Sequence, residues 1–242
     1  MRVIEVFADV SCPFTHAGLR TVVRARHRAG RDDVALRVRA WPLELVNGTP
    51  MSPLRAAEHV DTLRRQAVPD LFTHFEVDRF PSTSLPALAL AAAAYRRGDA
   101  RGEAVSLALR EALFEEGRDI SRADVLADIA RLHDVGEPGP ADDEAVRADW
   151  REGTGRGVRG SPHFFCGDLD SFCPSLDISR DDAGHLQVHL DTDALRTLSV
   201  RLPGGVIRSA GGAGPTGRTG RRGRPPPRRA GSCPRPPRWS AR

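Results

Sequence analysis

The stretch VIEVFADVSCPFTHAG, Val3–Gly18, decides the fold predicted for this chain. Its apolar first half predicts a buried strand over Val3–Ala8. A short polar break follows, and Cys12 and Pro13 then open a helical pattern that continues over Thr15–Arg28. A cysteine at such a turn lies where unpaired backbone N–H groups and the helix dipole favour negative charge. Cys12 is therefore predicted to be a reactive thiol of lowered pKa, with a small buried hydrophobe as the alternative.

Strand patterns flank this stretch and return near the end of the chain. Val34–Trp41 alternates apolar and polar residues, which predicts a second strand and hence a parallel β-α-β unit with a right-handed crossover. His163–Cys166 predicts a later strand, and Leu176–Ser179 with Leu186–Leu190 is typical of a hairpin. A closing helix is expected over Thr192–Leu202.

The middle of the chain shows helical patterns and no convincing strand. The predicted helices are Ser52–Gln66, Pro86–Arg97, Glu103–Glu116, Ser121–His133 and Asp142–Trp150. In the fourth, Ser121 is the expected N-cap and Leu132 belongs to the apolar stripe. The glycine-spaced Gly153–Gly160 is expected to be a loop, and it lacks the Gly-Lys-Ser/Thr ending of a phosphate-binding loop.

Composition bounds the class of protein. The chain has 242 residues, 40% hydrophobic and 28% charged, which is ordinary for one large or two small soluble domains. No apolar run reaches membrane-spanning length, and the N-terminus does not resemble a signal peptide, so a cytoplasmic location and no membrane partner are expected. Four cysteines are too few for a disulfide scaffold.

The basic balance comes from the C-terminal segment. Residues 203–242 hold ten Arg, nine Gly, eight Pro and no acidic residue, which predicts a disordered tail. Without these ten arginines, residues 1–202 have 26 basic and 32 acidic residues, a formal net charge of −6. The basic pI is therefore no argument for a nucleic-acid partner. A tail that contacts nucleic acid or acidic membrane is the less favoured alternative to a nonfunctional extension.

Three stretches in this order resemble one known family. They are FADVSCPFTHAG over Phe7–Gly18, FEEGRDISRADVLADIA over Phe114–Ala130, and GVRGSPHFF over Gly157–Phe165. Together they resemble the thioredoxin-like DsbA family, in the cytosolic branch with a helical domain inserted into the fold. The resemblance covers about residues 1–202 and leaves out the tail.

The resemblance implies an α/β thioredoxin-like fold with an inserted all-helical domain. Residues 1–48 and 151–202 would form the thioredoxin-like domain and residues 49–150 the insertion, with the active-site cleft between them. In this family a cis-proline lies against the active-site cysteine, which assigns that place to Pro162. The backbone of the preceding residue, here Ser161, would pair with an extended thiol-bearing substrate.

The chain departs from the family in its opening motif. Redox members carry Cys-x-x-Cys, whereas this chain has Cys12, Pro13, Phe14 and Thr15. A mixed disulfide on Cys12 would then be released by an external thiol such as glutathione. The Thr15 hydroxyl can hydrogen-bond the thiolate and hold its pKa down. His16 is interpreted either as a group that lowers the Cys12 pKa or carries a proton, or as a solvated or capping residue.

Cys12 and Thr15 are thus the catalytic candidates. The substrate-binding candidates are Pro13, Phe14, His16, Ser161 and Pro162. Cys166 is expected to be a packed core thiol, and the reach of Cys173 to Cys12 is left open. The spacing of Cys166 and Cys173 matches none of the usual zinc pairs, so no metal site is expected. Cys233, in the tail, is given no role.

These residues favour a monothiol DsbA-like thiol–disulfide oxidoreductase or isomerase. It would hold no bound cofactor, use glutathione or another low-molecular-weight thiol as co-substrate, and act on a thiol- or disulfide-bearing protein or small molecule. One alternative is a glutathione-dependent isomerase or transferase of the kappa or hydroxychromene carboxylate isomerase type. The missing second cysteine favours this alternative and the retained Cys12 disfavours it. The other alternative is a catalytically inactive thioredoxin-fold binding protein. The sequence does not predict an oligomeric state.

Overall fold

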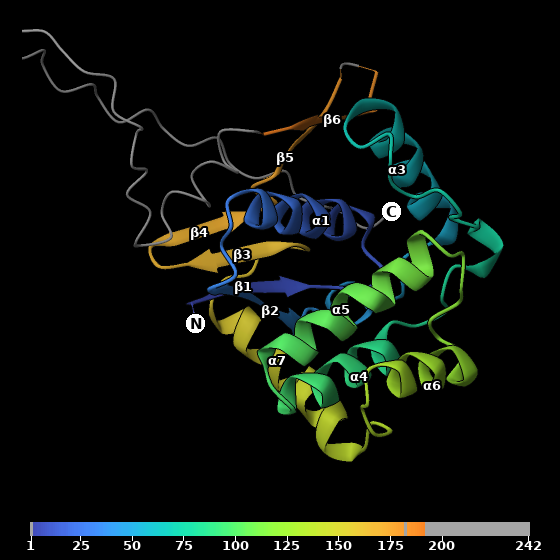
Figure 1. Cartoon of the computed structure of the whole chain (residues 1–242). Coiled ribbons are helices and arrows are strands. Elements are labelled where there is room, and N and C mark those ends of the chain that lie inside the picture. Colours follow the sequence, from blue (N-terminus) through green and yellow to red (C-terminus); the bar gives the residue numbers. More distant parts are fainter. Residues whose placement is uncertain (1, 182, 192–242) are drawn as a thin grey trace, which may run out of the picture. The chain divides into compact units, whose positions relative to one another are not determined.

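A four-stranded sheet with the order β2-β1-β3-β4 forms the centre of the structure, a computed structural model that describes residues 2–181 and 183–191 (Figure 1). Strand β1 (Arg2–Ala8) pairs in parallel with β2 (Val34–Ala40). Strand β3 (His163–Cys166) pairs antiparallel with β1, and β4 (Leu169–Phe172) pairs antiparallel with β3. The predicted parallel β-α-β opening is confirmed, while β4 was not predicted.

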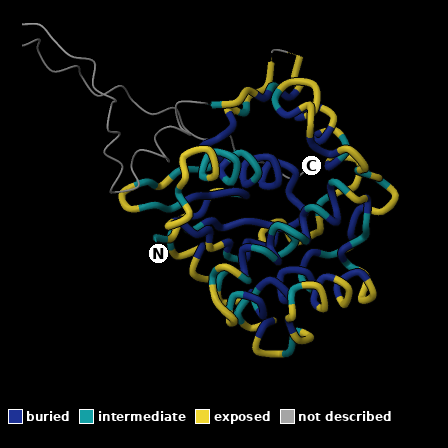
Figure 2. Tube along the Cα trace, viewed as in Figure 1, coloured by how far each residue is buried: buried dark blue, intermediate teal, exposed yellow. Residues whose placement is uncertain are grey.

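Helix α1 (Pro13–Arg28) covers one face of this sheet (Figure 1). Side chains alternate along a strand, so one set of β1 residues faces α1 and the other faces away. Ile4 and Val6 pack with Leu19 and Val22 of α1 in one buried cluster. Figure 2 shows the central strands as buried, and the outer faces of the surrounding helices as more exposed. Apolar burial on this face fixes the position of α1 over the sheet.

The opposite face of the sheet is covered by α7 (Pro140–Gly155). Phe7 and Trp41 pack edge to face on this side, with ring centres 6.5 Å apart. Gly153 lies so close to them that an added Cβ would be 2.6 Å from the Trp41 ring. The predicted loop over Gly153–Gly160 is therefore wrong in its first part, because α7 continues through Gly155 and needs a glycine against the aromatic rings.

The segment between β2 and β3 is helical throughout its regular structure. Its elements before α7 are α2 (Leu43–Asn47), α3 (Pro53–Gln66), the 3-10 turn η1 (Val77–Arg79), α4 (Leu85–Arg96), α5 (Asp99–Phe114) and α6 (Ala123–Leu132). Helices α4, α5 and α7 all contact β2, so this segment packs directly on the sheet. The predicted absence of strands here holds for the described residues. The division of the chain into two domains stays a prediction.

Two details of α6 differ from the prediction. Its N-cap is Arg122 and not Ser121, because the Ser121 hydroxyl donates to the carboxylate of Asp119 at 2.6 Å. Leu132, expected in the apolar stripe, is 79% exposed at the end of the helix. The remaining stripe, Val125 and Ile129 included, is buried as predicted.

The predicted hairpin is confirmed as a separate two-stranded sheet of β5 (Leu176–Arg180) and β6 (Leu186–Leu190). It is attached to α3, since the N–H of Val188 donates to Gln66 Oε1 at 2.7 Å. The predicted helix over Thr192–Leu202 and the predicted tail lie outside the described residues. Among the described helices, none combines the length and apolarity needed to cross a bilayer.

Candidate active site

Cys12 lies at the N-cap of α1, where the chain leaves the loop after β1. Its S–H donates to the main-chain carbonyl of Ser161, with sulfur and oxygen 3.2 Å apart. The peptide bond between Ser161 and Pro162 is cis. Cys12 is 2% exposed and Ser161 8% exposed. The structure thus brings together the opening motif and the Ser161–Pro162 segment.

Thr15 and Ser161 connect these two segments through their side chains. Their hydroxyl oxygens are 2.8 Å apart, and the Ser161 hydroxyl also accepts the N–H of Asp9 at 2.9 Å. Both side chains are buried, so the bonds are shielded from competing water. Pro13 takes the first position of α1, as its sequence position predicts.

Burial opposes ionisation of the Cys12 thiol. Burial raises the pKa of Cys12 above its ordinary value, and hydrogen bonds with Thr15 and Ser161 oppose this effect without reversing it. The prediction of a lowered pKa is therefore wrong for this state, because removal of the sulfur from water outweighs the position at the helix start. The prediction that Thr15 lowers the pKa agrees with the direction of its hydrogen bond.

The carboxyl group of Asp9 fixes the loop that carries Cys12. One oxygen accepts the N–H and hydroxyl of Ser11, both at 2.8 Å. The other accepts the N–H of Leu43 at 2.6 Å and the hydroxyl of Ser84 at 3.0 Å. Burial raises the pKa of Asp9, and these bonds oppose that rise. Asp9 thereby joins the active-site loop to the first turn of α2 and to the residue before α4.

A buried arginine from α5 lies beneath the same loop. Arg110 is 1% exposed and donates to the main-chain oxygen of Asp9 at 3.2 Å. It also donates to the carbonyl and hydroxyl of Ser106, at 2.6 and 2.7 Å. Burial lowers the pKa of Arg110 to about 10, and negative charge on Asp9 and Cys12 opposes that fall. Arg110 therefore keeps its charge at neutral pH, close enough to Cys12 to act on it electrostatically.

Phe14 faces a histidine that the sequence did not connect to the motif. The ring centres of Phe14 and His59, on α3, are 4.8 Å apart, and His59 is 5% exposed. Its Nδ1 has no hydrogen-bond partner among the described residues. Burial, together with the nearby cations Arg55 and Arg180, lowers the pKa of His59 to about 4. His59 is thus a neutral ring that packs beside the motif at physiological pH.

His16 does not face the Cys12 thiol. It is 1% exposed, and its Nε2 lies 2.6 Å from a carboxylate oxygen of Glu115. The ring also packs against Phe72 and Phe114. The interpretation of His16 as a solvated residue is therefore wrong. Its bond to Glu115 ties α1 to the end of α5, and its role in substrate binding stays a prediction.

Acid is expected to destabilise the protein through this pair. Burial lowers the pKa of His16, although Glu115 opposes the shift. Burial would raise the pKa of Glu115, but bonds from His16, Phe72 and Thr73 lower it to about 2. As pH falls below about 6.5 and then 4.5, the unfolded chain therefore binds protons at both sites before the folded chain does, and the free energy of unfolding decreases.

Glu115→Gln tests this dependence by urea unfolding at pH 7 and about pH 3.5. We expect a loss of about 1–2 kcal/mol at pH 7, and a smaller further loss on acidification than in the unmodified protein. Glu116→Gln is the matched control, because that neighbouring side chain is 56% exposed. Equal pH dependence of Glu115→Gln and the unmodified protein would contradict the assignment.

The other two described cysteines lie in different surroundings. Cys166 is half-buried at the end of β3 and packs against the cluster of Ile4 and Val6. Cys173 is 3% exposed and follows β4 directly. Its N–H donates to the carbonyl of Pro162 at 2.9 Å. Among the described residues, no group of three or more His, Cys, Asp or Glu side chains is placed to hold a metal ion.

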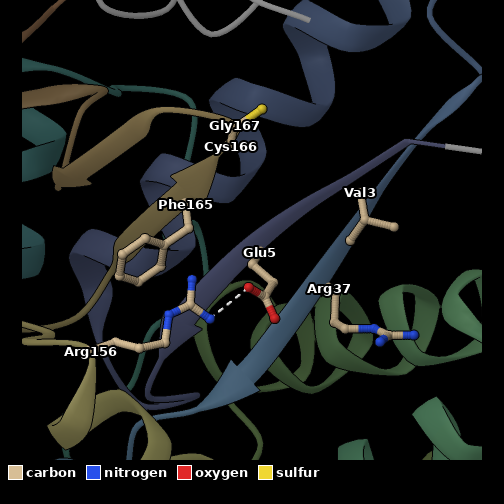
Figure 3. Close-up of a pocket in the computed structure, with 7 residues that line it drawn as sticks. All are labelled: Val3, Glu5, Arg37, Arg156, Phe165, Cys166 and Gly167. Carbon is tan, nitrogen blue, oxygen red and sulfur yellow. Dashed lines mark hydrogen bonds and ion pairs between the residues drawn. The ribbon is translucent and has the colours of Figure 1, made fainter.

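A cavity of about 380 Å³ lies elsewhere on the sheet (Figure 3). Arg156 stands over the Phe165 ring at 3.9 Å and donates to Glu5 at 2.7 Å, so its charge is already paired. The Cys166 sulfur points away from this pair in Figure 3. The lining residues are Val3, Glu5, Arg37, Arg156, Phe165, Cys166 and Gly167, and none of them is a predicted site residue.

Solved structures of three proteins share the fold. Cytosolic disulfide reductase DsbM from Pseudomonas aeruginosa, with GSH, aligns with a TM-score of 0.53 and 19% identity, over 83% of this chain and 98% of its own. A putative protein disulfide isomerase from Nitrosomonas europaea aligns with a TM-score of 0.59 and 13% identity, over 82% of this chain and 96% of its own. A 2-hydroxychromene-2-carboxylate isomerase aligns with a TM-score of 0.51 and 15% identity, over 70% of this chain and 88% of its own.

Identities this low establish the fold and leave the activity open. No curated protein matches the chain in sequence. A family model described as a DSBA-like thioredoxin domain does match, over residues 3–181. This range contains the Cys12 motif, the helical segment and the cis-proline segment, and it spans well over half of the chain. The chain therefore belongs to the family of DSBA-like thioredoxin domains, as its three resembling stretches predicted.

Proposed function

We propose that this protein is a thiol–disulfide oxidoreductase in which Cys12 is the nucleophile and an external low-molecular-weight thiol completes turnover. The observation that carries the proposal is the contact of the Cys12 thiol with the Ser161 carbonyl, beside a cis peptide bond. A main-chain segment next to the thiol offers hydrogen-bonding groups that can align an extended substrate. The DSBA-like family supports the same class of reaction.

The reaction would proceed in two exchange steps. The Cys12 thiolate attacks one sulfur of a substrate disulfide, forms a mixed disulfide and releases the first substrate thiolate, which takes up a proton. Because the motif has Thr15 where a second cysteine would stand, the thiolate of an external thiol such as glutathione then attacks the substrate sulfur of the mixed disulfide. The bond to Cys12 breaks and the Cys12 thiolate is regenerated. The second half of the substrate leaves as a mixed disulfide with the external thiol, which a second external thiol reduces. Thr15 stabilises the thiolate, since its hydrogen bond lowers the Cys12 pKa. Ser161 and Pro162 align the substrate, and Pro13 and Phe14 line its path.

The substrate would be a disulfide- or thiol-bearing protein or small molecule, and the location cytoplasmic. DsbM, which shares the fold, is described as a cytosolic disulfide reductase, and one of its structures is with GSH. No bound cofactor enters the proposed reaction.

A second candidate is a glutathione-dependent isomerase or transferase. The structural likeness to 2-hydroxychromene-2-carboxylate isomerase favours it, together with the missing second cysteine in the motif. In that case glutathione would bind as a thiol cofactor beside Cys12 without any disulfide exchange.

The two candidates are separated by the glutathione dependence of disulfide reduction. We expect the protein to reduce a disulfide-linked peptide at a rate that rises with glutathione concentration and with pH from 7 to 9, because the Cys12 pKa is raised. Oxidised glutathione should oxidise Cys12, which mass spectrometry should detect as a glutathionyl adduct or as a disulfide that forms from that adduct. Glutathione binding with neither adduct nor reduction at any pH would favour the isomerase. Absence of binding, adduct and reduction would overturn both candidates.

A further inference from the structure

We propose that Cys173 is the resolving thiol of Cys12, so that the two cysteines form a disulfide during turnover. This inference rests on the proposed role of Cys12 as nucleophile. It replaces the missing second cysteine of the motif by a cysteine 161 positions later in the chain. The external thiol would then reduce an internal disulfide in place of a mixed one.

Both cysteines meet the same dipeptide. The thiol of Cys12 lies 3.2 Å from the carbonyl oxygen of Ser161, and the N–H of Cys173 lies 2.9 Å from the carbonyl oxygen of Pro162. The second bond continues the β3–β4 ladder by one position beyond the pair of His163 and Phe172. Cys12 thus approaches the cis-proline segment from α1, and Cys173 approaches it from the adjacent strand.

The segment that contains Cys173 also packs on α1. A Cβ added to Gly18 would lie 3.0 Å from the Ser175 hydroxyl and 3.7 Å from Pro162, so the helix contacts the residue two positions after Cys173 and the proline whose carbonyl accepts the Cys173 N–H. Cys173 itself has a φ of 47°, a left-handed conformation that is uncommon for a residue with a side chain. This conformation begins the turn that carries the chain from β4 across to the hairpin.

The two thiols share one buried environment. Cys12 is 2% exposed and Cys173 is 3% exposed, and both belong to the same apolar cluster. Burial raises the pKa of Cys173, and negative charge on Cys12 raises it further. The two thiols are therefore close enough to interact electrostatically, and because the thiolate is the attacking form, the step through Cys173 should become faster as pH rises.

Cys166 does not lie beside the cis-proline segment. It lies four residues beyond Pro162 on β3, which corresponds to roughly 13 Å along an extended strand. The bonds that hold β3 between β1 and β4 keep it at that distance. Cys166 is therefore a matched control for Cys173.

The proposed step balances without a further reactant. In the mixed disulfide, Cys12 is bonded to one substrate sulfur. The Cys173 thiolate attacks the Cys12 sulfur, the bond to the substrate breaks, and the departing substrate thiolate takes up the proton that Cys173 lost. The substrate disulfide has then gained two electrons and two protons, and Cys12 and Cys173 have lost them. Two equivalents of external thiol reduce the new disulfide and become a disulfide themselves.

The disulfide can be trapped and located by mass spectrometry. The full chain is oxidised with oxidised glutathione, alkylated and digested with trypsin. We expect residues 3–20 to be linked to residues 160–180, the tryptic peptide that contains both Cys166 and Cys173. Cys166→Ser should keep the link, whereas Cys173→Ser and Cys173→Ala should lose it and accumulate the glutathionyl adduct. A link that survives in both Cys173 variants would overturn the inference.

Kinetics separate this inference from the proposed function. At limiting glutathione, Cys173→Ser and Cys173→Ala should reduce a disulfide-linked peptide about tenfold more slowly, with unfolding curves as the check on folding. Unchanged rates and an unlinked oxidised protein would overturn the role of Cys173 and leave the single-thiol function in place. An active Cys12→Ser protein would instead overturn the proposed function.

Discussion

Replacing Cys12 by serine is expected to lower the rate of glutathione-dependent disulfide reduction at least a thousandfold. A hydroxyl group neither attacks a disulfide readily nor forms one, so both exchange steps are lost. A thousandfold loss corresponds to about 4 kcal/mol of lost transition-state stabilisation. The fold should persist, because a serine hydroxyl can still donate to the Ser161 carbonyl, the contact that the Cys12 thiol makes. The measurement is the reduction of a disulfide-linked peptide under saturating glutathione.

The matched control is Cys166→Ser, which changes the same atom at a half-buried position outside the site. We expect its rate to stay within about twofold of the unmodified protein, with a change of roughly 0.5 kcal/mol in the free energy of unfolding. Retention of a tenth or more of the activity by Cys12→Ser would exclude Cys12 as the nucleophile. Equal losses in both variants would indicate damage to the fold instead of loss of a reacting group.

The elements with strong apolar periodicity could be predicted from the sequence. The predicted α5 residues Val105 and Leu109 are buried, and β1 and β2 pair as their alternation indicated. Strand β4 was missed, because Leu169–Phe172 has polar residues in its centre and forms through pairing with β3. Such a strand depends on a neighbour distant from any local signal, and local propensity does not encode that neighbour.

The site could be predicted only in part for a similar reason. The meeting of Cys12 with Ser161 was implied by family resemblance, and no periodicity in this sequence would have indicated it. The direction of the Cys12 pKa shift was missed, since it depends on burial by segments far along the chain. The Glu115 partner of His16 was missed as well. Contacts between residues about a hundred positions apart have no local sequence signal.

Arg110 is the residue of the site that sequence reasoning overlooked, although a signal was present. It falls next to Leu109 on a helix whose apolar positions are buried, where a charge needs a specific partner. We expect Arg110→Met to lower the free energy of unfolding by about 3 kcal/mol, because the buried Asp9 carbonyl loses its donor and the buried Asp9 carboxyl group loses the nearby cation. We also expect alkylation of Cys12 to shift to higher pH, since a nearby cation that favours the thiolate is lost.

Two further variants separate charge from packing. Arg37→Met removes an arginine that is half-exposed and paired with Asp99, so it should cost at most about 1 kcal/mol and leave the Cys12 pH profile unchanged. Arg110→Lys keeps the charge without the forked geometry, and it should restore most of the pH profile but little of the stability. If Arg110→Met lowers stability while the pH profile of Cys12 stays constant, Arg110 only supports the loop. A shift that Arg110→Lys reverses would show that the helical segment between β2 and β3 contributes charge to the thiol as well as structure.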